Sequence, residues 1–330
     1  MNSVTLPFHL PKSFLRGRAA NRILPVDALD VAGRKALRKL FVEMARHQPG
    51  IVAGDDPLAI HDMRVAVRRM RAAFELFGQA LPRKAIKSYG RSLKELGGLL
   101  GAVRDLDVLI ANGQAYLETL PQDQRPAFQP LIDFTQSRRD TARGPLLAFL
   151  AGEEYAAFTR EYPVFLSETQ PAASQPGQLS RVSELAPLLI LERLGQARSF
   201  DGHVTSLSLE QLHALRGAIK RLRYAIEFFQ EPLGPQAVAL IAGLKGVQGH
   251  LGRLNDANVA AQSIQEFITD WDARQLALPA YERRSSVPFL PYLTLTLSQR
   301  DELVQAFPAI WEQFNAGDFR RRLSHALARL

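Results

Sequence analysis

Cysteine is absent from this sequence of 330 residues. The chain therefore forms no disulfide framework, and no thiolate can act as a nucleophile or as a metal ligand. The absence of cysteine suits a reducing compartment. No uninterrupted apolar run approaches the roughly 20 residues that a membrane-spanning helix needs. The opening segment, MNSVTLPFHLPKSFLRGR, is broken by prolines and lacks the apolar core of a secretory signal peptide. We expect a cytoplasmic protein without a membrane span.

Alternating strand-like patterns are nearly absent as well, whereas long amphipathic runs are separated by glycine and proline. The pattern predicts an all-α protein in which Ser208 and Gln211 form a capping box. The predicted helices span residues 30–47, 57–80, 83–102, 104–119, 124–149, 153–167, 183–199, 209–230, 235–252, 254–277, 299–315 and 318–329. The segment SSVPFLPY, residues 285–292, is predicted to form a local loop.

One segment has the composition of a linker. It reads TQPAASQPGQLS, covers residues 169–180, and is polar with two prolines. It divides the chain near its middle. The sequence therefore predicts an N-terminal extension at 1–25, a first helical half at 26–168, a linker at 169–182 and a second helical half at 183–330.

The two halves repeat each other. IHDMRVAVRRMRAAFELF (60–77) aligns without gaps with LHALRGAIKRLRYAIEFF (212–229), a shift of 152 residues. LKELGGLLGAVRDLDV (93–108) aligns in the same way with LKGVQGHLGRLNDANV (244–259), a shift of 151 residues. Two blocks in the same order at nearly the same shift indicate a duplicated helical unit.

The first block places its basic residues on one helical face. At about 100° per residue, the positions that share a stripe about 80° wide are His61, Arg64, Arg68 and Arg71, repeated as His213, Arg216, Lys220 and Arg223. The apolar side chains lie on the opposite face, and Arg69 and Arg221 fall outside the stripe. Like charges four residues apart repel, and no acid on this face offsets them. The stripe therefore indicates a binding face rather than a merely solvated one.

The second block brings glycine to one face. Lys94, Gly98, Gly101 and Asp105 share a side, and Lys245, Gly249, Gly252 and Asp256 repeat it. A glycine inside a helix costs about 1 kcal/mol relative to alanine. The glycine faces favour close approach of another helix over ligand contact, and the aspartates are expected to hold Arg or Lys side chains.

The overall charge points to the same kind of partner. The formal net charge is +8, from 41 basic and 33 acidic residues, which favours a polyanion. We find no aromatic side chain on the basic stripes, whereas binders of single-stranded nucleic acid interleave aromatic and basic residues. No helix-turn-helix, zinc-finger or RNP motif is present.

These repeated blocks resemble the signature segments of the CHAD family, the conserved histidine α-helical domain, over roughly residues 30–315. The resemblance implies two antiparallel four-helix bundles, related by pseudo-twofold symmetry, around a basic groove that binds inorganic polyphosphate without catalysis. Family members are often joined to a CYTH domain, but the ExExK pattern of that domain is absent here, so the chain resembles a stand-alone CHAD protein. Asn255 replaces the arginine found at Arg104, and Gly217 interrupts the second signature helix.

The residues expected to bind polyphosphate combine the stripes and the two lysines beside them. They are His61, Arg64, Arg68, Arg71, Lys94, His213, Arg216, Lys220, Arg223 and Lys245, followed in rank by Arg69, Arg221, Arg104 and Arg253. The two histidines either donate to phosphate or orient their neighbours. Association with polyphosphate granules and their proteins is a further expectation.

Three alternatives remain open at this point. The chain could be a helical nucleic-acid-binding protein, or a scaffold whose basic face holds an acidic protein. The pair His61-Asp62 suggests a metal-dependent phosphohydrolase, although the second copy reads His213-Ala214 and does not keep the acid. We expect no catalytic residue, no metal and no cofactor.

Overall fold

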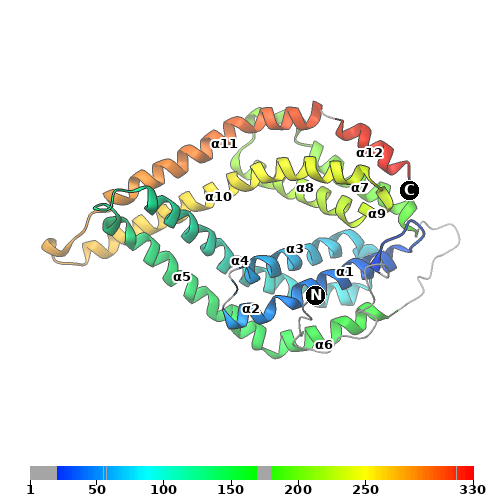
Figure 1. Cartoon of the computed structure of the whole chain (residues 1–330), viewed down its shortest axis with the longest axis horizontal. Coiled ribbons are helices and arrows are strands. Elements are labelled where there is room, and N and C mark those ends of the chain that lie inside the picture. Colours follow the sequence, from blue (N-terminus) through cyan, green and yellow to red (C-terminus); the bar gives the residue numbers. More distant parts are fainter. Residues whose placement is uncertain (1–20, 55, 57, 169–179, 317) are drawn as a thin grey trace.

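A computed structural model describes residues 21–54, 56, 58–168, 180–316 and 318–330 (Figure 1). These residues carry no β-strand, and an isolated bridge joins Ala28 to Arg181, so the all-α prediction is confirmed. The first half contains α1 (Leu29–Arg46), α2 (Gln48–Ala53), α3 (Ala59–Phe77), α4 (Arg83–Thr119), α5 (Arg125–Ala151) and α6 (Glu153–Ser167). The second half contains α7 (Val182–Arg198), α8 (Leu209–Phe228), α9 (Gln230–Leu233), α10 (Gln236–Leu276), α11 (Leu290–Ala316) and α12 (Phe319–Leu327). The predicted extension up to residue 20 and linker residues 169–179 lie outside the described residues.

Two helices are longer than the sequence pattern predicted. α4 has 37 residues and α10 has 41, so the predicted breaks at residues 103 and 253 are wrong. Neither helix contains proline. Glycine lowers helix propensity but keeps the backbone N–H that proline lacks, so the glycine-rich stretches do not end these helices.

Other boundaries also differ from the prediction. α11 begins at Leu290 rather than at residue 299, after a 3₁₀ turn at Val287–Phe289, so only the start of the predicted loop is non-helical. The short helix α2 was not predicted, because six residues are too few to show a period. The capping box is confirmed: the Gln211 N–H donates to Ser208 Oγ over 3.2 Å, and the Ser208 N–H donates to Gln211 Oε1 over 2.8 Å.

The helices of each half pack in the same order. α1 packs on α3, α3 on α4 and α4 on α5, while α7 packs on α8, α8 on α10 and α10 on α11. In Figure 1 the helices α1–α6 form the lower part of the molecule and α7–α12 the upper part. The repeated order of packing agrees with the duplication seen in the sequence.

A single hydrophobic core runs through both halves. Phe77, at the end of α3, is fully buried, and its ring lies 5.7 Å from that of Phe228 and 5.6 Å from that of Phe229. All three rings belong to one continuous cluster of apolar side chains. The two halves are therefore joined by packed aromatic rings at one end of the molecule.

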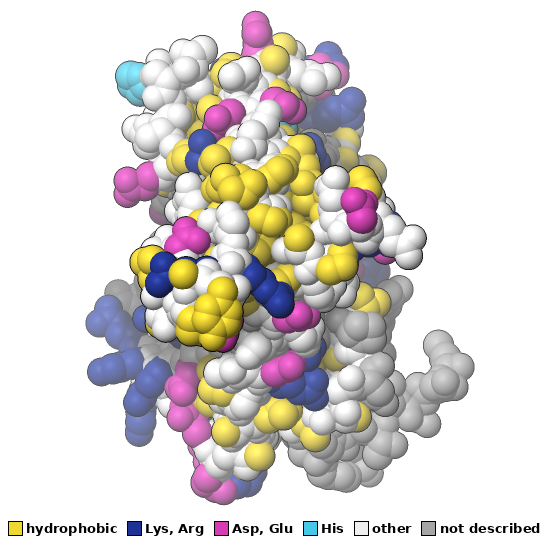
Figure 2. Space-filling view, turned by 90° about the vertical axis from the view of Figure 1, so that its left-hand side faces the viewer, with side chains coloured by type: hydrophobic (Ala, Val, Ile, Leu, Met, Phe, Trp, Pro, Cys, Tyr) yellow, Lys and Arg dark blue, Asp and Glu magenta, His cyan; other side chains and the backbone are white. Residues whose placement is uncertain are grey.

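The halves meet again at the tips of their long hairpins. A second apolar cluster joins Phe128 and Ile132 of α5 to Ile264 and Phe267 of α10. The rings of Tyr116 and Tyr292 stack there with centroids 4.5 Å apart. Figure 2 views this end of the molecule, where apolar side chains also reach the surface. The two meeting points hold α3 and α8 in a fixed relation to each other.

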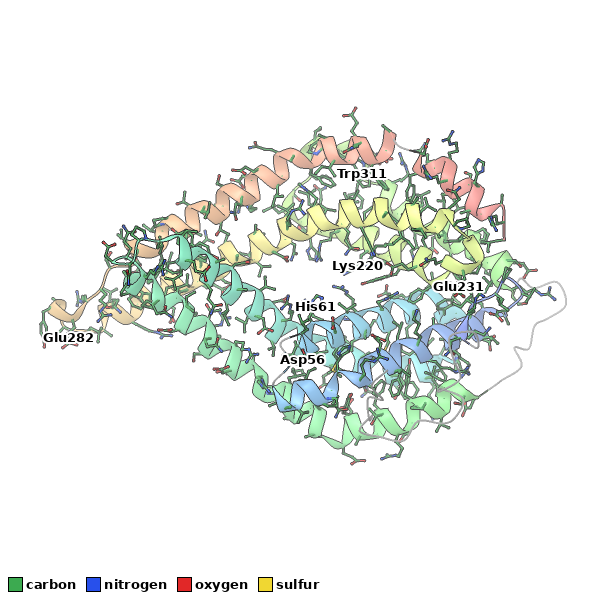
Figure 3. The ribbon with its side chains drawn as sticks, viewed as in Figure 1. Asp56, His61, Lys220, Glu231, Glu282 and Trp311 are labelled. Atoms are coloured by element: carbon green, nitrogen blue, oxygen red, sulfur yellow. The ribbon has the colours of Figure 1, made fainter. Side chains whose placement is uncertain are left out.

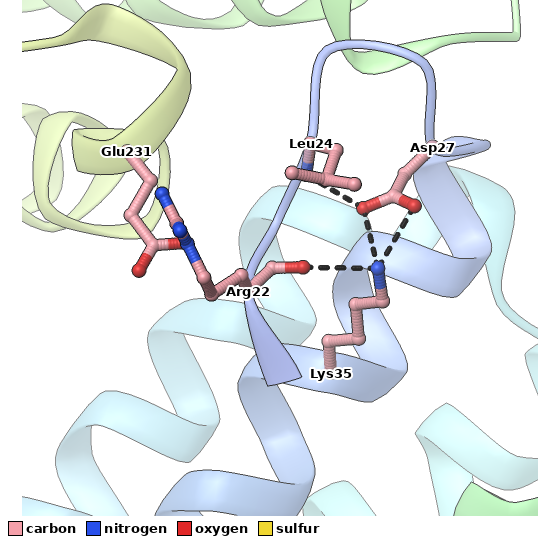
Figure 4. Close-up of polar contacts among 5 residues, drawn as sticks. All are labelled: Arg22, Leu24, Asp27, Lys35 and Glu231. Carbon is pink, nitrogen blue, oxygen red and sulfur yellow. Dashed lines mark hydrogen bonds and ion pairs between the residues drawn. The ribbon is translucent and has the colours of Figure 1, made fainter. Parts of the chain in front are cut away.

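The segment before α1 adds a polar tie between the halves (Figure 4). Asp27 accepts from the Leu24 N–H over 2.7 Å and from Lys35 Nζ over 2.8 Å, while Lys35 Nζ also donates to the Arg22 carbonyl over 2.9 Å. Arg22 in turn forms an ion pair of 3.4 Å with Glu231 of α9, the short helix that follows α8. These contacts fix the start of α1 against the second half.

Candidate functional site

The helices α3 and α8 pack on one another across the two halves. Each buries its apolar face in its own half, including Met63 and Val67 of α3 and Leu215 and Ile219 of α8. In Figure 3 His61 and Lys220 point from opposite sides into the space between the lower and upper helices. The two basic stripes consequently face each other.

One hydrogen bond joins the stripes directly. Arg68 Nε of α3 donates to the Tyr224 hydroxyl of α8 over 2.8 Å. Tyr224 is only 2% exposed, and it stands eleven residues after His213, within about 20° of it on the helix. The prediction that no aromatic side chain lies on the stripes is therefore wrong at Tyr224, whose counterpart in the first copy is Ala72.

Positive charge is concentrated where the stripes meet. Burial lowers the pKa of Arg216, Asp256 raises it, and Arg68 and Arg64 of the other half lower it. The pKa of Lys220 is lowered to about 8, first by burial and then by the neighbouring charges of Arg216 and Arg68. Glu75 acts in the opposite direction, and its effect is smaller than that of either arginine. A bound anion would relieve this repulsion, because it would supply the negative charge that the nearby acids supply only in part.

The site also contains a buried N–H donor without an acceptor among the described residues. Arg216 Nε is buried and has no hydrogen-bond partner among the described residues. Burial lowers the pKa of His61, and Arg104 lowers it further against the opposing effect of Asp62. Buried N–H groups are almost always paired in folded proteins. Oxygen atoms of an anion placed between the helices would satisfy them.

The second block has a different role from the one its glycines suggested. A Cβ at Gly98, Gly249 or Gly252 would meet no atom within 4 Å, so the prediction of close helix approach is wrong. Gly101 lies beneath the Arg64 guanidinium, with Nε 3.8 Å from the position of a Cβ. The glycines leave the surfaces of α4 and α10 beside the stripes open.

The aspartate of the first copy holds an arginine, as predicted. Arg64 Nη1 lies 3.0 Å from Asp105 Oδ1, which fixes the guanidinium over α4. In the second copy Asp256 raises the pKa of Arg216 without forming an ion pair. Arg64 is thereby positioned more firmly than its counterpart.

Two of the predicted ligand arginines converge instead on Glu227. Arg223 is 8% exposed; it forms an ion pair with Glu227 and donates from Nε to Gln248 Oε1 over 2.6 Å. Arg69 Nη2 reaches Glu227 Oε2 from the other half over 3.4 Å. Arg223 is therefore committed to internal partners. Glu227, four residues after Arg223 on the same face, was the sequence signal for this pairing. The expectation that no acid on this face offsets the basic residues is therefore wrong in the second stripe.

The remaining predicted ligands are exposed side chains. Arg71 and Lys94 of the first half are exposed, as are Arg221, Lys245 and Arg253 of the second. His213 is also exposed, and its Nδ1 lies 3.0 Å from Oδ1 of Asn255, the residue that replaces Arg104. We name the central group the basic cluster: His61, Arg64, Arg68, Arg104, Arg216 and Lys220.

Two features of the described residues bear on the alternatives. No group of three or more His, Asp or Glu side chains within the described ranges is arranged to hold a metal ion. None of the helices in those ranges is both long and apolar enough to cross a membrane.

The chain matches a known family of proteins. The family model of the CHAD domain matches residues 35–265, so the chain belongs to the CHAD domain family. This match covers the helices from α1 into α10 and ends before α11, short of the predicted 30–315. No curated protein matches the sequence.

Two solved structures share the fold. The crystal structure of the CHAD domain from the plant Ricinus communis is 23% identical, with 92% of this chain and 93% of that chain covered and a TM-score of 0.64. The structure of PptA from Streptomyces chartreusis is 17% identical, with 88% of this chain and 99% of that chain covered and a TM-score of 0.65. At these identities the likeness concerns the fold alone.

Proposed function

We propose that this chain binds inorganic polyphosphate at the basic cluster, without acting on it chemically. The observation that carries the proposal is the meeting of cationic side chains from two helices far apart in sequence. Arg64 and Arg68 of α3 lie close enough to Arg216 of α8 to lower its pKa, although like charges repel. Such an arrangement is stable only if other contacts hold it, and it serves a polyanion that spans both helices.

The chemistry of the cluster fits phosphate oxygens. Guanidinium groups present several donors in a planar fork that matches phosphate geometry. Polyphosphate has about one negative charge per residue and no bases, so it needs cations at regular spacing rather than stacking platforms. The aromatic ring nearest the cluster, Tyr224, is buried, and its hydroxyl is bonded to Arg68, so it offers no stacking face to a nucleobase.

The test compares two variants that each lose two arginines. Arg68→Gln with Arg216→Gln removes one fork from each half, whereas Arg160→Gln with Arg321→Gln removes the same charge from the exposed helices α6 and α12. The measurement is the affinity for linear polyphosphate by calorimetry at fixed salt. We expect the first variant to lose at least about 100-fold, since each charge-assisted contact contributes about 1.5–3 kcal/mol, and the control to change little.

Two further readouts separate polyphosphate from other ligands. The logarithm of the affinity is expected to fall steeply with the logarithm of the salt concentration, because several contacts release counterions. RNA of the same charge is expected to compete weakly. Equal loss in both double variants, or stronger binding of RNA, would contradict the proposal. A location in the cytoplasm, at polyphosphate granules, is part of the same proposal.

A further inference from the structure

A pocket that is partly open to solvent lies beside the basic cluster at the N-terminal end of α3. Its volume is about 290 Å³, and α2, α3, α4 and α5 supply its walls. The volume equals that of roughly ten water molecules, enough for a phosphate group of five heavy atoms. The walls include three arginines, Arg104, Arg139 and Arg143, together with the carboxylates of Asp56 and Asp107.

The contacts of these side chains leave one arginine unpaired. Arg139 Nε donates to Asp107 Oδ1 over 3.0 Å, and Arg143 Nη2 donates to the Ile51 carbonyl over 2.9 Å. Asp56 Oδ1 accepts from the Leu58 N–H over 2.9 Å. Arg104 has no hydrogen bond or ion pair with any described residue. Arg139 and Arg143 are held in place, and the guanidinium of Arg104 is left to receive an anion.

Arg104 belongs to both the pocket and the basic cluster. It lines the pocket, and it is the charge with the largest effect on the neighbouring His61. Ile60, the residue before His61, lines the pocket too. A chain of phosphates that lies on the cluster can therefore reach the pocket through Arg104, which belongs to both.

The equivalent place in the second half holds a much smaller cavity. Under the repeat, Ile60, Arg104 and Asp107 correspond to Leu212, Asn255 and Asn258. Those three residues line a cavity of only about 40 Å³ that contains no arginine. The two ends of the basic cluster consequently differ in volume and in charge.

We propose that the arginine-lined pocket receives the terminal phosphate of a polyphosphate chain, which rests on the proposed function. An internal phosphate continues in two directions, whereas a terminal phosphate between walls from four helices needs room for the chain to leave in only one. A terminal phosphate also carries a second ionisable oxygen with a pKa near 6, so at neutral pH it brings about one more negative charge than an internal phosphate. One end of the chain is captured at Arg104, and the other end leaves past α8 and α10.

The test compares linear chains that differ only at their ends. The probes are a polyphosphate of about eight residues with free terminal phosphates and the same chain with both termini converted to alkyl phosphoramidates. The unmodified protein is expected to bind the free chain about tenfold more tightly than the blocked chain, a ratio that corresponds to about 1.4 kcal/mol. In Arg104→Asn, which introduces the residue of the second half, this ratio is expected to fall to about one.

Two controls isolate the pocket from the general effect of charge. Arg160→Asn removes a charge from the exposed helix α6 and is expected to keep the tenfold ratio. Arg104→Lys keeps the charge without the fork and is expected to restore part of the ratio. Equal affinity of the unmodified protein for free and blocked chains would overturn the capture of chain ends while leaving polyphosphate binding intact. The same follows if Arg104→Asn keeps the ratio. Absence of binding to either probe would overturn both proposals.

Discussion

Arg68 of α3 and Tyr224 of α8 are 156 positions apart in the sequence, yet Arg68 Nε donates to the Tyr224 hydroxyl over 2.8 Å. Because Tyr224 is buried, its hydroxyl accepts a hydrogen bond from Arg68 in place of one from water. The bond directs one guanidinium of the first half at the second half. It links the stability of the fold to the geometry of the basic cluster.

The substitution Tyr224→Phe tests this bond. It leaves the ring in place and removes the acceptor, so the free energy of unfolding is expected to fall by about 1.5–3 kcal/mol, the usual contribution of a hydrogen bond to a charged group. The measurement is denaturant unfolding. The matched control is Tyr155→Phe, because the Tyr155 hydroxyl is buried without a partner and its removal is expected to be neutral or stabilising. Equal losses in the two variants would contradict the role of the bond.

The open glycines give a prediction in which stability and binding move in opposite directions. Gly98→Ala and Gly249→Ala place a methyl group where no atom lies within 4 Å, so each is expected to stabilise the chain by about 1 kcal/mol through helix propensity. Gly98 and Gly249 share a helical face with the expected ligands Lys94 and Lys245, so both methyl groups are expected to weaken polyphosphate binding. Thermal unfolding and calorimetric titration measure the two effects.

Two further glycines serve as controls for that experiment. Gly195→Ala in α7 also meets no atom, and it is expected to stabilise without changing affinity. Gly33→Ala is expected to destabilise, because its methyl group would stand 2.9 Å from Phe77 Cβ. Unchanged affinity in the Gly98 and Gly249 variants would place the ligand away from α4 and α10.

The sequence predicted the helices because they depend on local periodicity, and it indicated a duplication through two blocks that align at nearly the same shift. It did not predict that α4 and α10 run through their glycines, since the tertiary packing that supports a long helix is not local. Helical phase alone put Arg223 on the binding stripe, but Glu227 and Gln248 draw it into the interior. The hydrogen bond between Arg68 and Tyr224 could not be predicted from the sequence either, because the two residues meet only through the packing of the two halves.

Lys220 gives the fold a defined dependence on pH. Its pKa is about 8 in the folded chain, mainly because the side chain is buried, whereas the unfolded chain has the ordinary value of about 10.4. Between these values the unfolded chain binds more protons, so the free energy of unfolding is expected to rise as the pH increases from about 8 to about 10.4. Below about pH 8 Lys220 is charged in both states, and its burial cost is fully present.

Removal of the amine tests this dependence. Lys220→Met is expected to be more stable than the unmodified chain at pH 7. Its free energy of unfolding is expected to rise less between pH 8 and pH 10, because the contribution of Lys220 is gone. Denaturant midpoints at several pH values measure it. Lys87→Met, on the exposed surface of α4, is the control. Parallel pH curves for the unmodified chain and Lys220→Met would show that Lys220 does not carry the effect.

The last prediction tests whether a charge on one stripe changes the pKa of a residue on the other. Arg68 of α3 is one of the charges that lower the pKa of Lys220 in α8. Arg68→Gln removes that repulsion, so the pKa of Lys220 is expected to rise from about 8 towards its ordinary value, and only part of the way because burial remains the larger cause. The measurement is an NMR titration of ¹³C-labelled lysine, with the Lys220 signal assigned by its loss in Lys220→Met.

The control for this titration is Arg71→Gln, which removes the same charge from an exposed position of the same helix. It is expected to shift the pKa of Lys220 much less, because exposed charges are screened by solvent. Equal shifts in the two variants would indicate a general effect of net charge and not two facing stripes. Polyphosphate is expected to act in the same direction as Arg68→Gln, since its negative charge opposes the same repulsion. Binding near pH 8 should therefore take up protons, which calorimetry in buffers of different ionisation enthalpy measures.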